Sequence, residues 1–394
     1  MNSAQKYLFL VELEHNKEKI MTESQSALNS RYIIDGKDMD ATPGQILSAI
    51  CDGASPAGDD GYQDIIDESA DPLPGNGVFE PSKANEYAAL TANAARNSFH
   101  LSYCGSLSRL AVARALLEAI FREGSFKLGD LRPDAAWCWD EEPVGGMAAF
   151  YESVSCACEY LDNLGVRLRS YKYGAGAVNR LDISCNSVAA SSAADALFEE
   201  NPFGSQDAHI GPELRCPDKA LRGKGDWLLY IPFDTCNYRL GGSLLSQVTS
   251  QDGGKSPDLA DADYFIDCYE VVRELIEDGI AIAGRPVADG GLMTAVVKFL
   301  GGKALKADVA SLMRASGEDD AVKLLFGEIP GVLLQIKDSD FDYVDAELLL
   351  QDVAYYPLGQ FSGEDGPLEN DTSGQTALKR ILLSLMDNAT EGED

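Results

Sequence analysis

The stretch that decides the fold is Arg285-Pro286-Val287-Ala288-Asp289-Gly290-Gly291-Leu292-Met293-Thr294-Ala295-Val296-Val297-Lys298-Phe299-Leu300, which has the pattern of a tight turn followed directly by a helix. Asp289 is predicted to be the N-cap, because its carboxylate can accept hydrogen bonds from amides that the first helical turn leaves unpaired. Gly290 and Gly291 allow the backbone or a ligand to approach this helix end closely. Such an N-terminus can bind an anion, although most Asp-Gly-Gly turns are ordinary capped turns.

Further motifs on both sides of this turn occur in a characteristic order. Leu240-Gly241-Gly242-Ser243 precedes a helical stretch, and Phe326-Gly327-Glu328-Ile329-Pro330-Gly331 leads into an apolar segment. Together with Ser108-Arg109-Leu110-Ala111-Val112-Ala113 and Ala135-Ala136-Trp137, this order resembles the carboxy-terminal half of the large, single-chain phosphoribosylformylglycinamidine synthase (FGAM synthase) of purine biosynthesis. The resemblance covers roughly residues 90–365. It implies an α/β (α+β) fold, an AIR-synthase-like two-domain unit with mixed sheets covered by helices.

The resemblance and the local composition divide the chain into five parts. We expect a divergent amino-terminal segment and linker at 1–85, an amino-terminal-type domain at 86–185, a crossover linker at 186–225, a carboxy-terminal-type domain at 226–365 and an acidic tail at 366–394. The linkers are inferred from their many Gly, Ser, Pro and Asp residues. The domains are inferred from apolar residues that recur at helix and strand spacing.

Apolar periodicity predicts individual elements within these parts. Helices are expected at 45–50, around 107–120, at 147–161 with Gly165 closing the helix, at 264–278, after Asp289, at 319–326 and at 341–350. Strands are expected at 6–13, 99–103, 166–173, 227–233, 304–309, 332–336 and 354–360. Strands that alternate with helices in the second half indicate helices packed on a sheet.

The charge balance of the chain excludes some classes of partner. Its 394 residues include 64 acidic and 32 basic ones, which gives a formal net charge of −32. The resulting field repels phosphate backbones and anionic lipid surfaces, so neither nucleic acid nor a membrane is expected as a partner. An acidic surface fits high solubility, a salty environment or a basic partner, and the composition does not choose among these.

Cysteine and histidine usage argues against a zinc site. The nine cysteines are scattered and lack paired Cys-x-x-Cys spacing, and the three histidines are far apart. Free cysteines of this kind fit a reducing compartment. The chain has no run of about 18 apolar residues that could span a bilayer, and its first residues are too acidic for a signal peptide. We therefore expect a cytoplasmic protein.

The resemblance also implies where an active family member performs its chemistry. The family binds ATP and Mg²⁺ with ligands from a helix and from a His-Asp-x-Ser sequence that precedes Asp-Gly-Gly. Here the helix positions fall on Arg114 and Glu118, and residues 285–288 read Arg-Pro-Val-Ala. An arginine repels a divalent cation at a position where a carboxylate would bind it. No catalytic residue, no metal ligand and no cofactor is therefore expected.

Four family positions remain candidates for nucleotide binding, and these are Asp289, Gly290, Gly291 and Lys172. If the chain is active, the bound cofactor is ATP or ADP with Mg²⁺. Alternatively, Arg285, Lys172 and Arg114 converge on a phosphate without metal. A third possibility is that these cations are solvated and that Arg114 pairs with Glu118 one helical turn away.

Three functions are compatible with this pattern. The first is a catalytically inactive FGAM-synthase-like protein, a pseudoenzyme that serves as a structural or partner-binding subunit. The second is a divergent FGAM synthase subunit, an ATP-dependent carbon–nitrogen ligase that converts an amide to an amidine and needs a separate partner half. The third is a metal-independent module that binds a phosphorylated metabolite.

The resemblance further implies an assembly, because synthase halves of the family pair through their sheets. The family's glutaminase domain would lie beyond residue 394, so we expect no ammonia production from glutamine. A single half leaves a sheet face or edge, which a protein partner, a second copy or residues 1–85 would cover. Arg167 and Arg169 are the basic residues expected near that contact.

Overall fold

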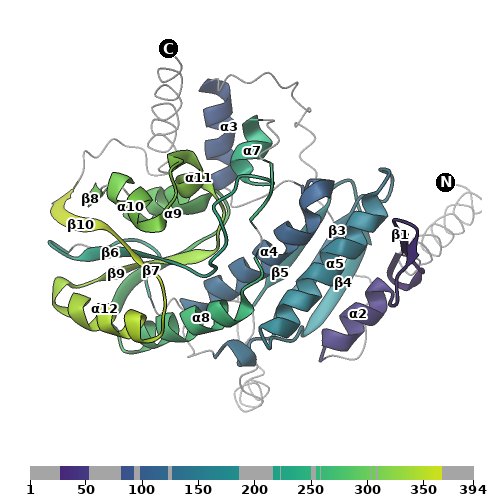
Figure 1. Ribbon diagram of the computed structural model, residues 1–394, viewed down its shortest axis with the longest axis horizontal. Helices are drawn as coiled ribbons and strands as arrows, with labels where there is room; N and C mark the ends of the chain where they lie inside the picture. Colours follow the sequence, from purple (N-terminus) through teal and green to yellow (C-terminus); the bar gives the residue numbers. More distant parts are fainter. Residues whose placement is uncertain are drawn as a thin grey trace, which may run out of the picture.

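The computed structural model describes residues 27–52, 81–92, 98–122, 127–185 and 216–365, except positions 222, 250–253, 258, 302 and 308. Within these residues the fold is α/β, with sheets covered by helices, as the sequence predicts. The prediction of mixed sheets holds for the three-stranded sheet but is wrong for the five-stranded one, which is antiparallel throughout. Figure 1 shows one sheet with its helices on the right and a larger sheet with helices on both faces on the left. The strand predicted at 6–13 and the tail at 366–394 lie outside the described residues.

The smaller sheet has three strands. Its central strand β3 (Asp134–Trp139) pairs in parallel with β4 (Ser170–Ala175) and antiparallel with β5 (Arg180–Ser184). Helices α4 (Cys104–Ile120) and α5 (Gly146–Asn163) lie across one face of this sheet (Figure 1). Buried residues alternate with more exposed ones along β4 and β5, as expected for strands with helices on one face.

The predicted helix α5 begins and ends where its sequence indicates. Gly165 follows the helix with φ +67°, a conformation that glycine adopts without strain at a helix C-terminus. A polar contact joins α5 to α4, because the hydroxyls of Ser153 and Ser108 lie 2.6 Å apart, and Trp137 donates to the Ser153 hydroxyl at 3.0 Å. These three buried polar groups therefore satisfy one another.

The larger sheet has five strands in the order β7 (Ala281–Val287), β9 (Gly331–Ile336), β6 (Trp227–Pro232), β10 (Tyr356–Asp365) and β8 (Lys303–Ala307). Every neighbouring pair in this sheet is antiparallel. Strand β9 is buried at each of its positions. A strand with no exposed residue requires helices on both faces of the sheet.

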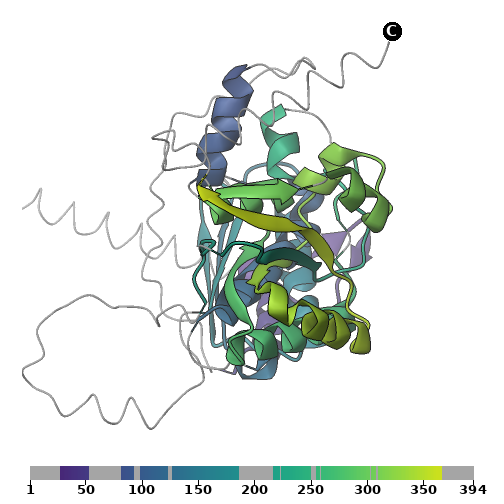
Figure 2. The same cartoon turned by 90° about the vertical axis from the view of Figure 1, so that its left-hand side faces the viewer.

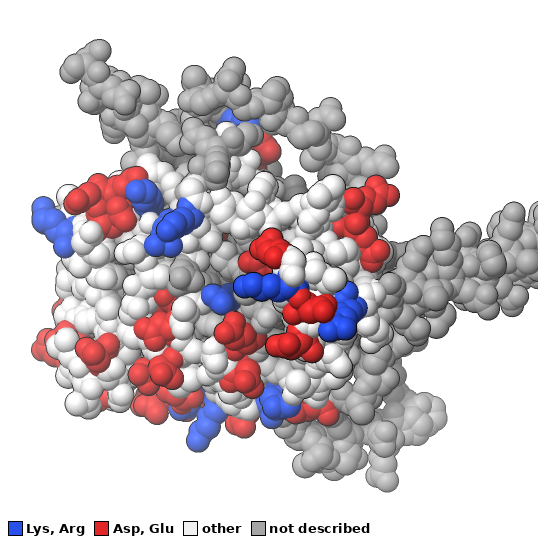
Figure 3. Space-filling view, turned by 45° about the vertical axis from the view of Figure 1, so that its right-hand side comes forward, with Lys and Arg blue, Asp and Glu red and all other residues white. Residues whose placement is uncertain are grey.

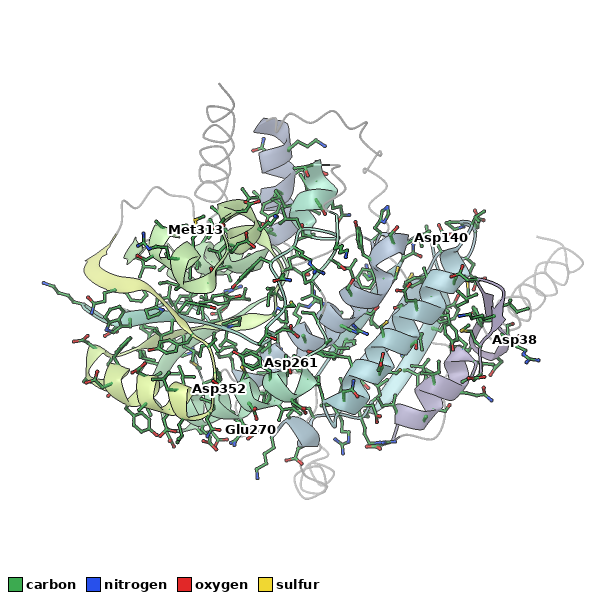
Figure 4. All side chains as sticks on the ribbon, in the orientation of Figure 1. Asp38, Asp140, Asp261, Glu270, Met313 and Asp352 are labelled. Atoms are coloured by element: carbon green, nitrogen blue, oxygen red, sulfur yellow. The ribbon has the colours of Figure 1, made fainter. Side chains whose placement is uncertain are left out.

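Two layers of helices provide this cover. One face carries α8 (Ala262–Glu277) and α12 (Phe341–Leu350), and the other carries α9 (Gly291–Leu300), α10 (Val309–Ser316) and α11 (Ala321–Phe326), as Figures 1 and 2 show. Along β6 the side chains alternate between the two layers: Leu228 and Tyr230 join the core under α9 and α11, whereas Leu229 and Ile231 join the core under α8 and α12. Side chains fill the space on both sides of the sheet (Figure 4).

The remaining elements are short or peripheral, and they are the hairpin β1 (Ile33–Ile34) and β2 (Lys37–Asp38), α2 (Pro43–Ile50), α3 (Pro81–Ala92), α7 (Leu244–Thr249) and the 3₁₀ helices η1 (Leu101–Tyr103), η2 (Leu128–Asp130) and η3 (Asp338–Asp340). Helices α3 and α7 pack on each other at the top of Figure 1. None of the helices in the described residues combines the length and the apolar character needed to cross a membrane.

Some predicted elements are wrong. The strand predicted at 99–103 is partly the 3₁₀ helix η1, whose N-cap His100 accepts a hydrogen bond from the Ser102 N–H at 3.3 Å. The strand predicted at 166–173 begins only at Ser170, because the backbone of Leu168 bonds to residues 50 and 52 of the segment that contains α2. Residues 285–287, predicted as part of a turn, are the end of β7.

The two arginines expected near an assembly contact have partners within the chain. Arg167 donates to the carboxylate of Asp52 at 2.7 Å, and Arg169 pairs with Asp134. Asp52 follows α2, which packs against α5. Part of the amino-terminal segment therefore folds back onto this half of the molecule, and the assembly itself stays a prediction.

Candidate functional site

A pocket of about 230 Å³ lies where α4, β7 and the start of α9 meet. Its charged lining consists of four basic and three acidic side chains, namely Arg114, Arg122, Arg285, Lys298, Glu118, Asp218 and Asp289. Apolar groups, among them Phe121 and Pro286, line the remainder. The pocket thus borders the Asp-Gly-Gly turn from which the sequence analysis started.

The two glycines of this turn are required by its geometry. Gly290 is the N-cap of α9 with φ +80°, and Gly291 follows with φ +69°. A Cβ atom on Gly291 would lie 2.8 Å from the Cα atom of Phe326, and one on Gly290 would lie 2.7 Å from the hydroxyl of Thr294. Both the backbone conformation and the space therefore exclude larger residues.

A buried carboxylate holds this turn from inside the protein. Glu328 is 2% exposed, and its Oε1 atom accepts hydrogen bonds from the Gly290 N–H at 2.9 Å and the Leu244 N–H at 2.8 Å. Tyr87 of α3 donates to the Gly290 carbonyl at 2.9 Å. The anion that a helix N-terminus of this kind favours is thus supplied by the chain itself.

The prediction that Asp289 is the N-cap of α9 is wrong. The N-cap is Gly290, and the Asp289 side chain forms an ion pair with Arg114 of α4. The two side chains are 11% and 25% exposed, and 175 residues separate them in sequence. The predicted pairing of Arg114 with Glu118 did not anticipate this contact. A guanidinium group therefore lies against the one carboxylate that the turn retains from the family motif.

Two further cations line the pocket. Arg285 donates to the backbone carbonyl of Asp218 at 3.3 Å and to its carboxylate at 3.4 Å, and Lys298 donates to the carbonyl of Thr91. Burial and then the charge of Arg285 lower the pKa of Lys298 to about 8, although Asp289 opposes this shift. Burial likewise lowers the pKa of Arg285. The protein therefore holds the positive charges of Arg285 and Lys298 in a partly buried place, where they lose favourable interactions with water.

The candidate residues from the sequence are only partly brought together. Asp289 lies with Arg114 and Arg285 in the pocket lining, next to the two glycines. Lys172 is an exposed residue of β4, where it pairs with Ala136, and it is not part of this lining. The predicted convergence of three cations is thus wrong for Lys172, and Lys298 lies in the pocket instead.

Sequence reasoning missed three residues that shape the site. Glu328 belongs to the quoted Phe-Gly-Glu-Ile-Pro-Gly motif, where an acidic residue among apolar ones could have indicated a buried partner. Tyr87 and Lys298 give no comparable local signal. Among the described residues, no three or more His, Cys, Asp or Glu side chains are grouped so that they could hold a metal ion.

Comparison with known proteins shows which proteins this chain is similar to. No protein-family model matches the chain. It is 27% identical over 293 residues to the probable phosphoribosylformylglycinamidine synthase, chloroplastic/mitochondrial, of Arabidopsis thaliana, and 28% identical over 262 residues to phosphoribosylformylglycinamidine synthase of Homo sapiens. The chain resembles phosphoribosylformylglycinamidine synthase. This confirms the resemblance recognised from the motifs.

The similarity to phosphoribosylformylglycinamidine synthase covers most of this chain but little of the relatives. The matches cover 72% and 66% of the chain and only 19% and 18% of the Arabidopsis and human proteins, so the chain spans about a fifth of the length of these relatives. Among solved structures, Thermotoga maritima PurL complexed with AMPPCP has a TM-score of 0.42 and 9% identity, with 67% of this chain and 38% of that chain covered. E. coli HypE, a hydrogenase maturation protein, has a TM-score of 0.37 and 14% identity, with 66% and 74% covered.

Proposed function

We propose that the protein is a catalytically inactive relative of phosphoribosylformylglycinamidine synthase that acts as a structural or partner-binding subunit. The ion pair between Arg114 and Asp289 is the observation that carries the proposal. It lies in the pocket at the Asp-Gly-Gly turn, where the family resemblance implies nucleotide and Mg²⁺ binding. The match covers only about a fifth of the relatives' length, so a separate protein partner or a homo-oligomer is part of the proposal.

The charge of Arg114 opposes a divalent cation at this turn. Mg²⁺ is bound by hard oxygen ligands, usually one or two carboxylates together with phosphate oxygens and water. Asp289 offers such an oxygen, but the guanidinium of Arg114 already neutralises it. At about 4 Å, a unit positive charge repels a dication by several kcal/mol even at an effective dielectric constant near 20. Magnesium-dependent ATP binding is therefore disfavoured.

The contacts that hold the turn also support a structural role. Gly290 and Gly291 are fixed by packing, and Glu328 occupies the anion position at the start of α9. These contacts stabilise the fold without any ligand. The chain therefore keeps what builds the turn, whereas Arg114 and Pro286 stand at positions where the family places metal ligands.

Calorimetric titration tests the proposal most simply. MgATP is titrated into the full chain, with ATP in EDTA and Mg²⁺ alone as controls. We expect no saturable heat and no ATP hydrolysis. Micromolar binding that requires Mg²⁺ would contradict inactivity and would favour the second candidate, a divergent synthase subunit that binds ATP or ADP with Mg²⁺ and completes its active site with a partner half.

The cations of the pocket favour one further candidate, a metal-independent site for a phosphorylated metabolite. Arg285 and Lys298 lie in the pocket with Arg114 and Arg122, and the pKa of Lys298 is about 8. If this candidate is right, ribose 5-phosphate binds in EDTA, and its affinity falls between pH 7 and pH 9 as Lys298 loses its proton. A Lys298→Met variant should lose this pH dependence. Absence of binding at pH 7 would dismiss the candidate.

A further inference from the structure

Helix α12 has an exposed apolar stripe on the side that faces away from the core. Tyr343 is 48% exposed, Leu349 67% and Leu350 77%, whereas Val344 and Leu348 on the opposite side are fully buried. Tyr343 and Leu350, seven residues apart, lie on one side of the helix, and Leu349 lies about 100° around the axis from Leu350 on the same solvent-exposed half. A contiguous apolar face on a surface helix is a feature of interaction sites.

Acidic residues surround this stripe. The segments 261–278 and 337–352, which contain α8 and α12, hold thirteen Asp and Glu residues but only two basic residues among 34 positions. The whole chain has 64 acidic residues among 394, so the local density is more than twice the average. The general acidity of the protein therefore does not account for this concentration.

The charges beside the stripe are mostly negative. Glu347, followed by burial and by the charge of Asp278, raises the pKa of Tyr343. The one basic residue of α8, Arg273, is 11% exposed and is bound by Glu270 at 2.6 Å and Glu277 at 2.8 Å, so these carboxylates neutralise its charge.

This acidic rim lies on one side of the molecule. Figure 3 shows many acidic and few basic side chains over the lower left, the side on which α8 and α12 lie in Figure 1. Figure 4 places Asp261, Glu270 and Asp352 along these two helices. We call Tyr343, Leu349 and Leu350, together with the acidic residues of 261–278 and 337–352, the α8–α12 surface.

We propose that the α8–α12 surface docks a segment of a partner protein whose apolar side chains are flanked by Lys and Arg. The inference rests on the proposed partner-binding function and specifies the chemistry of the partner. Leucine and tyrosine side chains would be buried by the apolar part of the segment, and the acidic rim would pair with its cations. The negative charges of the rim favour association with a basic segment and disfavour association with acidic surfaces.

A second copy of the chain fits this surface poorly. A two-fold contact through α12 brings the same patch of both copies together, so the acidic rims would face each other. The net charge of −32 adds to that repulsion. An anionic membrane is opposed for the same reason. The acidic rim repels both of these surfaces, whereas it attracts a basic partner.

Binding of defined peptides tests the apolar part of the surface. A dye-labelled amphipathic helix of Leu and Lys is titrated with the full chain at about 150 mM salt, where the Debye length is near 8 Å, and fluorescence anisotropy is measured. The double variant Leu349→Ser/Leu350→Ser should bind at least about tenfold more weakly than the wild type. The matched control is Val144→Ser, since Val144 is 101% exposed on the distant turn between β3 and α5, and it should bind like the wild type.

A second pair of variants tests the charges. Asp278 is the C-cap of α8, where a cation suits the helix dipole, so Asp278→Lys changes the rim without endangering the fold. It should weaken peptide binding and reduce the salt dependence of the affinity. Glu142→Lys, an exposed residue on the turn that also carries Val144, should leave both unchanged. A peptide with Lys but no Leu should bind weakly to every variant.

Three results would overturn the proposal. The first is that the wild type binds no peptide, and the second is that the α8–α12 variants bind as the wild type does. The third is that the control variants lose as much affinity as the α8–α12 variants. Sedimentation that shows a wild-type dimer and a monomeric Leu349→Ser/Leu350→Ser variant would replace the partner by a second copy and also overturn it. MgATP binding measured in parallel would contradict inactivity alone, so the two failures are distinguishable.

Discussion

The turn at residues 288–291 and the pocket beside it use their polar groups in different ways. In the turn, Glu328 and Tyr87 satisfy the backbone of Gly290, and no ligand is needed. In the pocket, Arg114 and Asp289 neutralise each other across a distance of 175 residues in sequence. Under the proposed function, the residues that build this turn persist while those that would bind metal are replaced.

The largest effect is expected for Gly291→Val in the turn. The new side chain would meet the backbone of Phe326 at 2.8 Å, and the residue would need φ +69°, so we expect a loss of about 4 kcal/mol in the free energy of unfolding. Gly301→Ala is the control, because Gly301 also has positive φ but no neighbour within 4 Å of its Cβ position, and it should cost only about 1 kcal/mol. Equal costs in urea unfolding would show that the turn is not tightly packed.

The next effect concerns the buried carboxylate of the turn. Glu328→Ala leaves the Gly290 and Leu244 amides without this acceptor, and we expect destabilisation by about 3 kcal/mol. Glu328→Gln keeps a neutral oxygen acceptor and should cost about 1 kcal/mol less. Thermal unfolding of both variants measures the difference. A Glu328→Ala variant as stable as the wild type would remove Glu328 as the anion of this helix end.

On the pocket side, Lys298 should give stability a pH dependence. Its pKa is about 8 in the folded protein, whereas the ordinary pKa of a lysine is 10.5, so between these values the unfolded chain binds more protons and stability rises with pH. Relative to Lys298→Met, the wild type should gain about 2 kcal/mol from pH 8 to pH 10.5, after allowance for partial exposure. Lys323→Met, at an exposed lysine of α11, should follow the wild type across this range. Parallel curves for the wild type and Lys298→Met would contradict a buried, charged Lys298.

The smallest effect is expected for the ion pair itself. Asp289→Ala should cost about 1 kcal/mol, because it leaves Arg114 without this ion-pair partner. A double-mutant cycle with Arg114→Met isolates the pair, and we expect a coupling energy of about 1 kcal/mol. Strict additivity in chemical denaturation would show that the two side chains contribute independently.

Local patterns predicted most of the elements of the larger sheet. The helix at Phe341–Leu350 has the predicted bounds, and β6 and β9 lie where apolar runs indicate them. Strand β7 was missed because Gly284 and Pro286 interrupt its pattern. It is an edge strand of the sheet, and a proline is tolerated there because no ladder bond requires its missing N–H. Edge position is a property of the fold and cannot be derived from the local sequence.

The candidate site was less predictable than the fold. The two consecutive glycines predict a turn, and the structure confirms that only glycine fits at these positions. The partner of Asp289 depends on how α4 packs against β7, and no local pattern contains that information. Spacing on α4 favoured Glu118 as the partner of Arg114, whereas the structure adds Asp289 from another part of the chain. Long-range contacts of this kind decide the chemistry of the pocket.

The most direct test of the account is the effect of Mg²⁺ and ATP on thermal unfolding of the wild type and of Arg114→Glu. The variant places two carboxylates together at the turn, so it should be less stable than the wild type in EDTA and should regain stability with Mg²⁺. Arg122→Glu, at another cation of the same pocket, is the control. We predict that the wild type shows no shift of Tm with Mg²⁺ or MgATP. A wild-type Tm that rises with MgATP in a saturable way would contradict the central claim that the Arg114–Asp289 pair has replaced metal and nucleotide at this turn.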